Sequence, residues 1–226
     1  MNETTSEHPL VARLYDPVMA LPEQLVLGPH REALTAGVSG SVLDLGTGTG
    51  VLLPYFADNP EEMPDVTAVE PDPHMRAQAR DRASDLSIEV DIVDAGGEAL
   101  PFADNAFETV CASFVFCTIP NHERALSEVA RVLKPGGEFR FLEHVRGEDI
   151  AGIAHDIFAP CWHAVAGGCN LNRETDRLFL TDDRFRTVEF ERSEGIAGTV
   201  LPVVRGRLVC RPQSLRDRLL PSKWIS

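Results

Sequence analysis

The stretch that most constrains this chain is S-V-L-D-L-G-T-G-T-G at residues 41–50. An apolar run with one acid near its end, Asp44, is typical of the carboxyl end of a buried parallel strand. Glycines follow at positions 46, 48 and 50, and apolar residues then recur at helical spacing. Glycine accepts positive φ angles and lets a ligand approach the backbone closely. The stretch therefore predicts a strand, a glycine turn and a helix, with free backbone N–H groups in a ligand crevice.

Two acids indicate which ligand such a turn would take. The dinucleotide fingerprint G-x-G-x-x-G is absent, because Val51 stands where its third glycine would fall. Asp44 would repel a pyrophosphate but suits a cationic ligand. Glu70 follows a second strand expected at Val66–Val69, and an acid at that distance beyond the turn can accept hydrogen bonds from ribose hydroxyls. The alternatives are an NAD-dependent oxidoreductase, which the missing fingerprint disfavours, and a tight turn without a ligand.

The rest of the chain alternates between helix and strand signals. Asp72 before Pro73 is a typical helix start. Further helices are expected at 121–133 and 170–180, and further strands at 88–93, 109–116, 138–143, 184–192 and 203–210, the last two as an antiparallel hairpin. This order predicts an α/β fold: a Rossmann-like, doubly wound, mostly parallel seven-stranded sheet with an antiparallel closing strand and a helical cap.

A chain of 226 residues suits one such domain with small additions. Residues 1–39 are expected to form an N-terminal helical lid and 40–145 the cofactor-binding core. The segment 146–169 has no strand pattern and is expected to cap the crevice above the strand ends, where ligands bind in this architecture. Residues 170–226 would supply the C-terminal helix and the closing hairpin.

Composition narrows the possible functions. The net charge is −14, with two lysines against nineteen arginines. This charge argues against a nucleic-acid partner, because phosphate binding needs clustered Lys and Arg. Acid excess with scarce lysine resembles cytoplasmic proteins of salt-loving organisms, the alternative being an ordinary acidic solvated surface. Because residues 1–12 do not resemble a signal peptide and no apolar run reaches the length of a membrane span, we expect a cytoplasmic protein without a transmembrane segment.

The five cysteines do not indicate a metal or disulfide scaffold. They are odd in number, widely spaced and form no C-x-x-C pair. A zinc site and a disulfide framework are therefore both unexpected, and no metal site is predicted.

A series of motifs resembles the class I methyltransferases, which use S-adenosylmethionine. D-L-G-T-G-T-G at 44–50 and Glu70 are followed by E-A-L-P-F at 98–102 and R-V-L-K-P-G-G at 131–137. The resemblance, to the type 11 and UbiE-like enzymes of the quinone pathway, implies that the glycine turn holds the methionine part of the cofactor and Glu70 its ribose. The cofactor residues so implied, including a lid tyrosine, are Tyr15, Asp44, Gly46, Thr47, Gly48, Gly50, Glu70, Pro71, Gly97, Glu98 and Ser113.

One departure from that pattern concerns the adenine. Many relatives carry an acid two residues before Glu98, whereas this chain has Gly96 there and Asp94 as its nearest acid. A side-chain contact to adenine is therefore in question, and backbone contacts from Gly96 or Gly97 are the alternative.

The second half resembles the animal thiol methyltransferases of the methyltransferase-like group more closely. The shared motifs are C-x-x-x-x-x-C at 111–117, N-x-E-R at 121–124, F-L-E-H-V at 141–145, P-C-W-H at 160–163 and G-C-N-L-N-R-E at 168–174. Those proteins begin with a hydrophobic membrane anchor that has no counterpart in this sequence, so membrane attachment is not carried over. The resemblance implies a small-molecule methyl acceptor, with a thiol first.

Methyl transfer from a sulfonium is an in-line displacement, for which the protein aligns and deprotonates the acceptor. His144 is the candidate base, because it ends the fifth strand and its ordinary pKa suits proton transfer near neutrality. It could instead fix Glu143 or the lid. Trp162, Cys169 and Asn170 are candidates for the acceptor pocket, although Trp162 could be a packing anchor. A quinone-like carbon or another nitrogen or oxygen acceptor, and a non-catalytic cofactor-binding protein, are the alternatives.

Overall fold

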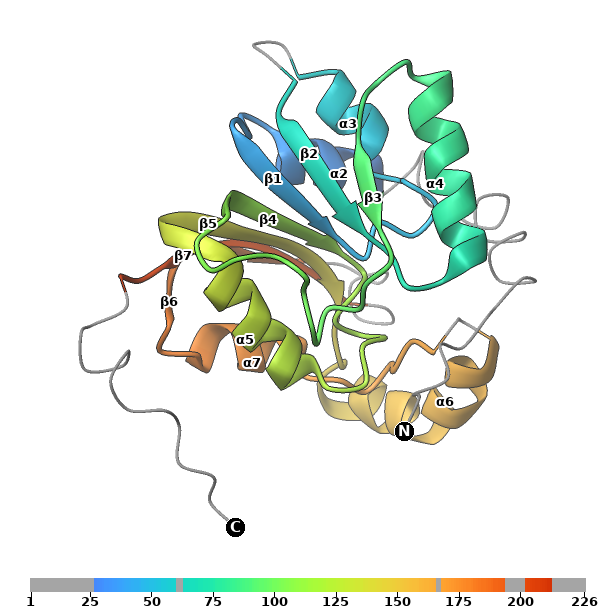
Figure 1. The fold of residues 1–226 in the computed structure, drawn as a ribbon. Helices are drawn as coiled ribbons and strands as arrows, with labels where there is room; N and C mark the ends of the chain where they lie inside the picture. The colour runs from blue at the N-terminus through green and yellow to red at the C-terminus, as the bar shows by residue number, and fades with distance from the viewer. Residues whose placement is uncertain (1–26, 60–62, 166–167, 194–201, 213–226) are drawn as a thin grey trace.

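The computed structural model describes residues 27–59, 63–165, 168–193 and 202–212. In these residues one sheet runs through the molecule in the order β3-β2-β1-β4-β5-β7-β6, with β7 antiparallel to both neighbours (Figure 1). Its strands are β1 (Ser41–Leu45), β2 (Asp65–Val69), β3 (Asp91–Val93), β4 (Phe107–Ser113), β5 (Leu133–His144), β6 (Phe185–Arg192) and β7 (Val203–Cys210). The predicted mostly parallel, doubly wound sheet with an antiparallel closing strand is confirmed.

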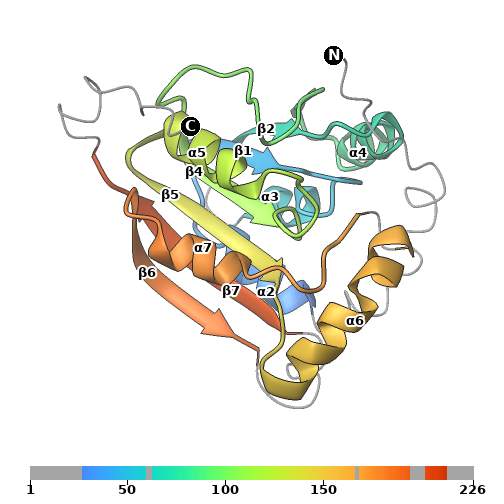
Figure 2. The same cartoon turned by 90° about the horizontal axis from the view of Figure 1, so that it is seen from below.

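Helices cover both faces of this sheet. They are α2 (Gly28–Thr35), α3 (Leu53–Ala57), α4 (Pro73–Asp85), α5 (His122–Val132), α6 (Asp149–Val165) and α7 (Thr175–Thr181). Alternation along β1 separates the two faces: Leu43 packs in the cluster that includes α5 and α7, whereas Val42 packs in the cluster that includes α2 and α3. Figures 1 and 2 show α5 and α7 along one face of the sheet.

Two predicted helix starts are confirmed by their capping bonds. The Asp72 carboxylate accepts hydrogen bonds from the backbone N–H groups of His74 and Met75 at 2.8 and 3.1 Å. The Asn121 side-chain oxygen accepts from the Arg124 N–H at 2.9 Å. Side chains at the caps therefore satisfy backbone donors that a helix start leaves unpaired.

Several predicted boundaries were wrong, among them the start of β5, which is Leu133 and not Glu138. β3 begins at Asp91 and not at Ile88, because Ser87 takes a φ of 54° and Ile88 donates to the Ala83 carbonyl at 3.1 Å, which keeps it at the end of α4. β4 ends at Ser113 and not at 116, where the chain turns away with a φ of 58° at Phe114. α7 begins five residues after Asn170, at Thr175.

The parallel strands place one end of the sheet for ligand binding. β1 lies between β2 and β4, so the strand order reverses there, and ligands bind in such sheets beyond the carboxyl ends of the strands at that point. α6 occupies most of the segment 146–169 and lies beyond the carboxyl end of β5 (Figure 2). Among the described residues, no helix is both long enough and apolar enough to cross a membrane.

Candidate functional site

The glycine turn after β1 has one open position and one packed position. Gly48 has a φ of +58°, and a Cβ added there would meet no atom within 4 Å. Gly50 has a φ of +81°, and its Cβ would lie 2.9 Å from the Leu53 side chain and 3.2 Å from the Ala79 backbone. Gly48 therefore leaves space for a ligand, whereas Gly50 allows α4 to pack against the turn.

The turn is anchored at its other positions. The Thr47 N–H donates to the Val69 carbonyl of β2 at 3.0 Å. At Gly46 a Cβ would lie 2.7 Å from the Val115 side chain, so this glycine permits the loop after β4 to come close. The backbone of the turn is therefore held between β2 and the loop after β4.

Asp44 lies beneath this turn as a buried acid. Its side chain is 1% exposed, and its Oδ2 atom has no hydrogen-bond partner among the described residues. Burial raises the pKa of Asp44 to about 7, against the lowering effects of the Thr47 side chain and the Arg31 guanidinium. An unpaired buried carboxylate oxygen suits a positively charged group of a ligand.

Glu70 follows β2 and binds the turn directly. Its Oε2 accepts from the Gly48 N–H at 3.0 Å and its Oε1 from the Asp72 N–H at 2.9 Å. Burial raises the pKa of Glu70, while these two hydrogen bonds lower it. Each carboxylate oxygen has more than one acceptor position, so the same side chain can also accept hydroxyl donors.

Arg76 of α4 supports the end of β2, a role that the sequence reading missed. Its Nη1 donates to the carbonyls of Glu70 and Pro71 at 2.6 and 3.0 Å, and its Nη2 pairs with Asp94 at 2.8 Å. Pro71, a predicted cofactor residue, is thus held through its carbonyl. Asp94, the acid nearest to Gly96, is already ion-paired with Arg76.

The loop of residues 94–101, which is expected to face the adenine, is held by packing and by a helix start. A Cβ on Gly97 would lie 2.9 Å from the Ile119 side chain, so this glycine lets the loop approach the segment after β4. Glu98 accepts from the Asn121 N–H at 3.3 Å at the start of α5. The side chain of Glu98 therefore joins two loops at the crevice.

The carboxyl end of β4 contains a strained residue. Ser113 is buried, and its Oγ has no partner in the described part of the chain. Phe114 takes a φ of 58° while its N–H donates to Leu142 at 2.8 Å. A bulky residue in this region of φ costs energy and is found where the surroundings enforce it, commonly at functional sites.

Glu143 of β5 holds the loop that follows β4. This fully buried carboxylate accepts from the N–H groups of Val115, Phe116 and Cys117 at 2.8, 2.9 and 3.4 Å. Burial raises the pKa of Glu143 to about 7, against the effect of these hydrogen bonds. The sequence placed Glu143 at the strand end, but its three donors come from a distant loop that no local pattern reveals.

The motif at 168–174 also forms hydrogen bonds with the loop after β4. The backbone N–H and the Nδ2 of Asn170 both donate to the Cys117 carbonyl at 2.9 Å. Arg173 donates through Nη1 to the carbonyls of Phe116 and Ile119 at 2.6 Å. Asn170 therefore positions the loop after β4, and its amide is engaged by the protein itself.

His144 lies at the end of β5, as expected, but its pKa does not fit the expectation. The ring is 4% exposed, and neither nitrogen has a partner among the described residues. Burial, together with His155 whose ring centre lies 5.7 Å away, lowers the pKa of His144 to about 4. The expectation of an ordinary pKa was wrong, because an imidazolium is disfavoured in a buried place.

Cys169 and Trp162 come together near the loop after β4. The side chains of Cys117 and Trp162 both lower the pKa of the Cys169 thiol, so the three side chains lie close together. Cys169 is half-buried, whereas Trp162 on α6 is 39% exposed. Two of the predicted acceptor residues are thus neighbours. Tyr15, the predicted lid residue, lies outside the described residues.

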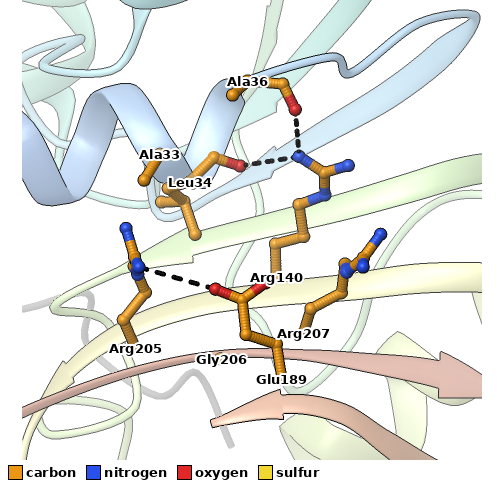
Figure 3. Close-up of a pocket in the computed structure, with 8 residues that line it drawn as sticks. All are labelled: Ala33, Leu34, Ala36, Arg140, Glu189, Arg205, Gly206 and Arg207. Carbon is orange, nitrogen blue, oxygen red and sulfur yellow. Dashed lines mark hydrogen bonds and ion pairs between the residues drawn. The ribbon is translucent and has the colours of Figure 1, made fainter. Parts of the chain in front are cut away.

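A groove elsewhere in the molecule is a weaker candidate. It has a volume of about 200 Å³ and lies between the end of α2 and strands β5, β6 and β7, with Arg140, Arg205 and Arg207 in its wall (Figure 3). Arg140 and Arg207 pair with Glu138 at 2.8 and 3.0 Å. Arg205 pairs with Glu191 at 2.6 Å. Their charges are therefore compensated within the protein.

In the described part of the chain, no group of three or more His, Cys, Asp or Glu could hold a metal ion.

Solved structures with this arrangement define the class of the fold. The YcgJ protein of Bacillus subtilis superposes with a TM-score of 0.66 at 16% identity, over 83% of this chain and 98% of that chain. A SAM-dependent methyltransferase from Aquifex aeolicus gives 0.62 at 20% identity, over 90% and 100%. The fold is that of the Rossmann-like methyltransferases.

Sequence comparison then gives the domain. Residues 43–141 match the family Methyltransf_11, described as a methyltransferase domain. The human thiol S-methyltransferases TMT1A and TMT1B are 36% and 32% identical over 149 and 165 residues, which are 62% and 69% of this chain. The C-methyltransferase UbiE of Klebsiella pneumoniae, from ubiquinone and menaquinone biosynthesis, is 35% identical over 142 residues, 59% of this chain and 55% of that protein.

Residues 43–141 therefore form a methyltransferase domain, and the cofactor that such a domain implies is S-adenosylmethionine. The aligned part of the chain spans 59% and 65% of the length of the two human relatives. The residues at the carboxyl ends of β1 and β2 fit such a cofactor, because the open position at Gly48 and the unpaired oxygen of Asp44 lie beside the Glu70 carboxylate.

Proposed function

We propose that this protein transfers a methyl group from S-adenosylmethionine to a small thiol. The observation that carries the cofactor part is the group formed by Gly48, Asp44 and Glu70 at the point where the strand order reverses. Asp44 would attract the cationic part of the cofactor, Glu70 would accept its ribose hydroxyls, and Gly48 would admit its methionine part. When bound, the cofactor supplies an electrophilic methyl group on a sulfonium.

The thiol acceptor is supported by the second half of the chain. The human relatives TMT1A and TMT1B are named as thiol S-methyltransferases. A thiol has a pKa near 8.5, so only a few per cent is thiolate at neutral pH. The protein must therefore orient the sulfur and help its proton to leave. Cys169 and Trp162 beside the loop after β4 are our candidates for lining the acceptor pocket.

We propose that His144 accepts a hydrogen bond from the methyl acceptor and does not act as the base that takes its proton. With a pKa of about 4 it is neutral at pH 7, and both ring nitrogens are without partners in the described residues. Full proton transfer to it from a thiol would be uphill by about 6 kcal/mol, from a pKa difference of about 4.5. A hydrogen bond from the acceptor S–H to the neutral ring would still orient the sulfur.

A carbon acceptor is the second candidate, because the UbiE relative is named as a C-methyltransferase of quinone biosynthesis. A flat quinol ring would need an aromatic-lined slot. The aromatic side chains of α6, Phe158 and Trp162, are 62% and 39% exposed. This exposure favours the thiol.

We propose the cellular compartment and the salt conditions from the net charge of the protein. A net charge of −14 with two lysines supports a cytoplasmic protein adapted to high salt. The same charge gives no support for a nucleic-acid partner. We also propose that the described residues of the segment 146–169 cap the acceptor side of the crevice; most of the lid predicted at 1–39 lies outside the described residues.

Labelled methyl transfer tests the proposed function. The protein is incubated with methyl-labelled S-adenosylmethionine and a panel of alkyl thiols, sulfide, phenols and quinols, at high and low potassium chloride. We expect label on thiols, with higher activity at high salt. His144→Ala should lower the rate, whereas His163→Ala, an exposed histidine of α6, serves as the matched control. Label on quinols alone would overturn the thiol assignment, and full activity of His144→Ala would remove the role of His144.

A further inference from the structure

Two cysteines that are distant in the sequence meet in this fold. Cys117 lies in the loop after β4, and Cys169 lies in the segment between α6 and α7. Cys169 directly precedes Asn170, whose bonds to Cys117 bring the two residues together; both are free thiols, and each affects the pKa of the other. The contact is held by the backbone, because the Asn170 N–H and Nδ2 both donate to the Cys117 carbonyl at 2.9 Å.

The two thiols differ in access and in acidity. Cys117 is buried, and the Cys169 side chain together with burial raises its pKa well above the ordinary value. Cys169 is half-buried, and the side chains of Cys117 and Trp162, with Arg173 nearby, lower its pKa. The Cys117 sulfur also lies 3.5 Å from the Phe114 carbonyl. The accessible sulfur is thus the more ionised one, which is the arrangement of a reactive thiol with a buried partner.

We infer that Cys117 and Cys169 form a redox-active dithiol that hydroperoxides oxidise to a disulfide. The Cys169 thiolate attacks the O–O bond of a hydroperoxide, so that an S–O bond forms and the O–O bond breaks. The departing oxygen takes a proton from solvent. Cys169 is then a sulfenic acid.

The second step closes the disulfide. The Cys117 sulfur attacks the Cys169 sulfur, so that the S–S bond forms and the S–O bond breaks. The hydroxide leaves as water with the proton of Cys117. In sum, two thiols lose two electrons and two protons, and one hydroperoxide is reduced to an alcohol, or to water if it is hydrogen peroxide.

The other cysteines supply internal controls. Cys161 is exposed on α6, and Cys111 is fully buried within β4. Oxidation governed by exposure alone would modify Cys161 first. The disulfide would join the segment after α6 to the loop after β4, so it would tie two separate parts of the chain together.

Peptide mapping after peroxide treatment tests the inference. The reduced protein is titrated with hydrogen peroxide, blocked with N-ethylmaleimide and digested without reductant. We expect a linked peptide pair containing Cys117 and Cys169, which dithiothreitol separates, in the native protein and in Cys161→Ser alike. In Cys117→Ser, a dimedone adduct should accumulate at Cys169, because the sulfenic acid has no partner.

Three results would overturn it. One is oxidation of Cys161 in the native protein while Cys117 and Cys169 remain alkylated. Another is oxidation of Cys169 to a sulfinic acid without any linked peptide. The third is an equal yield of dimedone adduct at Cys169 in native protein and Cys117→Ser. Because folding of each variant is checked by its thermal unfolding, a misfolded Cys117→Ser is replaced by Cys117→Ala.

Discussion

The burial of Asp44 predicts that cofactor binding depends on pH. Its carboxyl has a pKa of about 7 in the ligand-free protein. The proposed ligand carries a positive ammonium group, which favours the ionised carboxylate. Binding below pH 7 must therefore expel a proton, whereas binding above pH 8 need not. At pH 6 only about a tenth of the protein has Asp44 ionised, so the affinity should be about tenfold weaker than at pH 8.

Titration calorimetry measures both the affinity and the released proton. S-adenosylhomocysteine, which carries the ammonium but no sulfonium, is titrated at pH 6, 7 and 8 in buffers with different ionisation heats. We expect release of nearly one proton at pH 6, about half at pH 7 and almost none at pH 8. Asp44→Asn should bind more weakly and lose this pH dependence.

Glu143→Gln provides the matched control for Asp44→Asn. Burial raises the pKa of Glu143 to about 7 as well, but its hydrogen bonds go to the loop after β4 and not to the glycine turn. Proton release should therefore persist in Glu143→Gln. Native affinity that is constant from pH 6 to 8 without proton release would refute the reasoning, as would an unaltered pH dependence in Asp44→Asn.

Two further predictions concern the turn and the stability of the fold. Gly48→Ala places a methyl group in open space, so it should weaken S-adenosylhomocysteine binding at least about tenfold, or about 1.4 kcal/mol. A side chain at its φ of +58° is strained, so the melting temperature should also fall, but by less than in Gly50→Ala. Gly50→Ala should lower the melting temperature by several degrees, because overpacking costs about 1–3 kcal/mol. Calorimetry and thermal unfolding measure the two variants. Weaker binding in Gly50→Ala only, with a larger loss of stability in Gly48→Ala, would contradict the assignment of Gly48 to the ligand and Gly50 to packing. For Glu143, folding raises the carboxyl pKa from 4.5 to about 7, so its contribution to the free energy of unfolding should fall by about 3 kcal/mol as pH rises through this window. Urea unfolding of native protein and Glu143→Gln from pH 5 to 8 measures this difference, and equal slopes would exclude it.

The sequence predicted the cofactor side of the crevice because its determinants are local. The glycine turn and the Glu70 strand end each occupy a few consecutive residues, and helix caps such as Asp72 are read in the same way. The mostly parallel, doubly wound sheet was predicted from the helix–strand alternation, since parallel strands need crossovers.

The acceptor side depends on contacts between distant segments, which no local pattern records. Glu143 binds N–H groups that lie 26 to 28 residues away in the chain, and Arg173 binds carbonyls 54 and 57 residues away. The pKa of His144 is set by burial and by His155, neither of which spacing reveals. The contact between Cys117 and Cys169 likewise exists only after the chain has folded.

The most direct test of the account is a crystal structure of the protein with S-adenosylhomocysteine. The account predicts the ligand beyond the carboxyl ends of β1 and β2, with its ribose hydroxyls on Glu70, its ammonium group near Asp44 and its methionine part against Gly48. A ligand bound elsewhere, for example in the groove beside Arg140, with Asp44 and Glu70 free of contact, would contradict it.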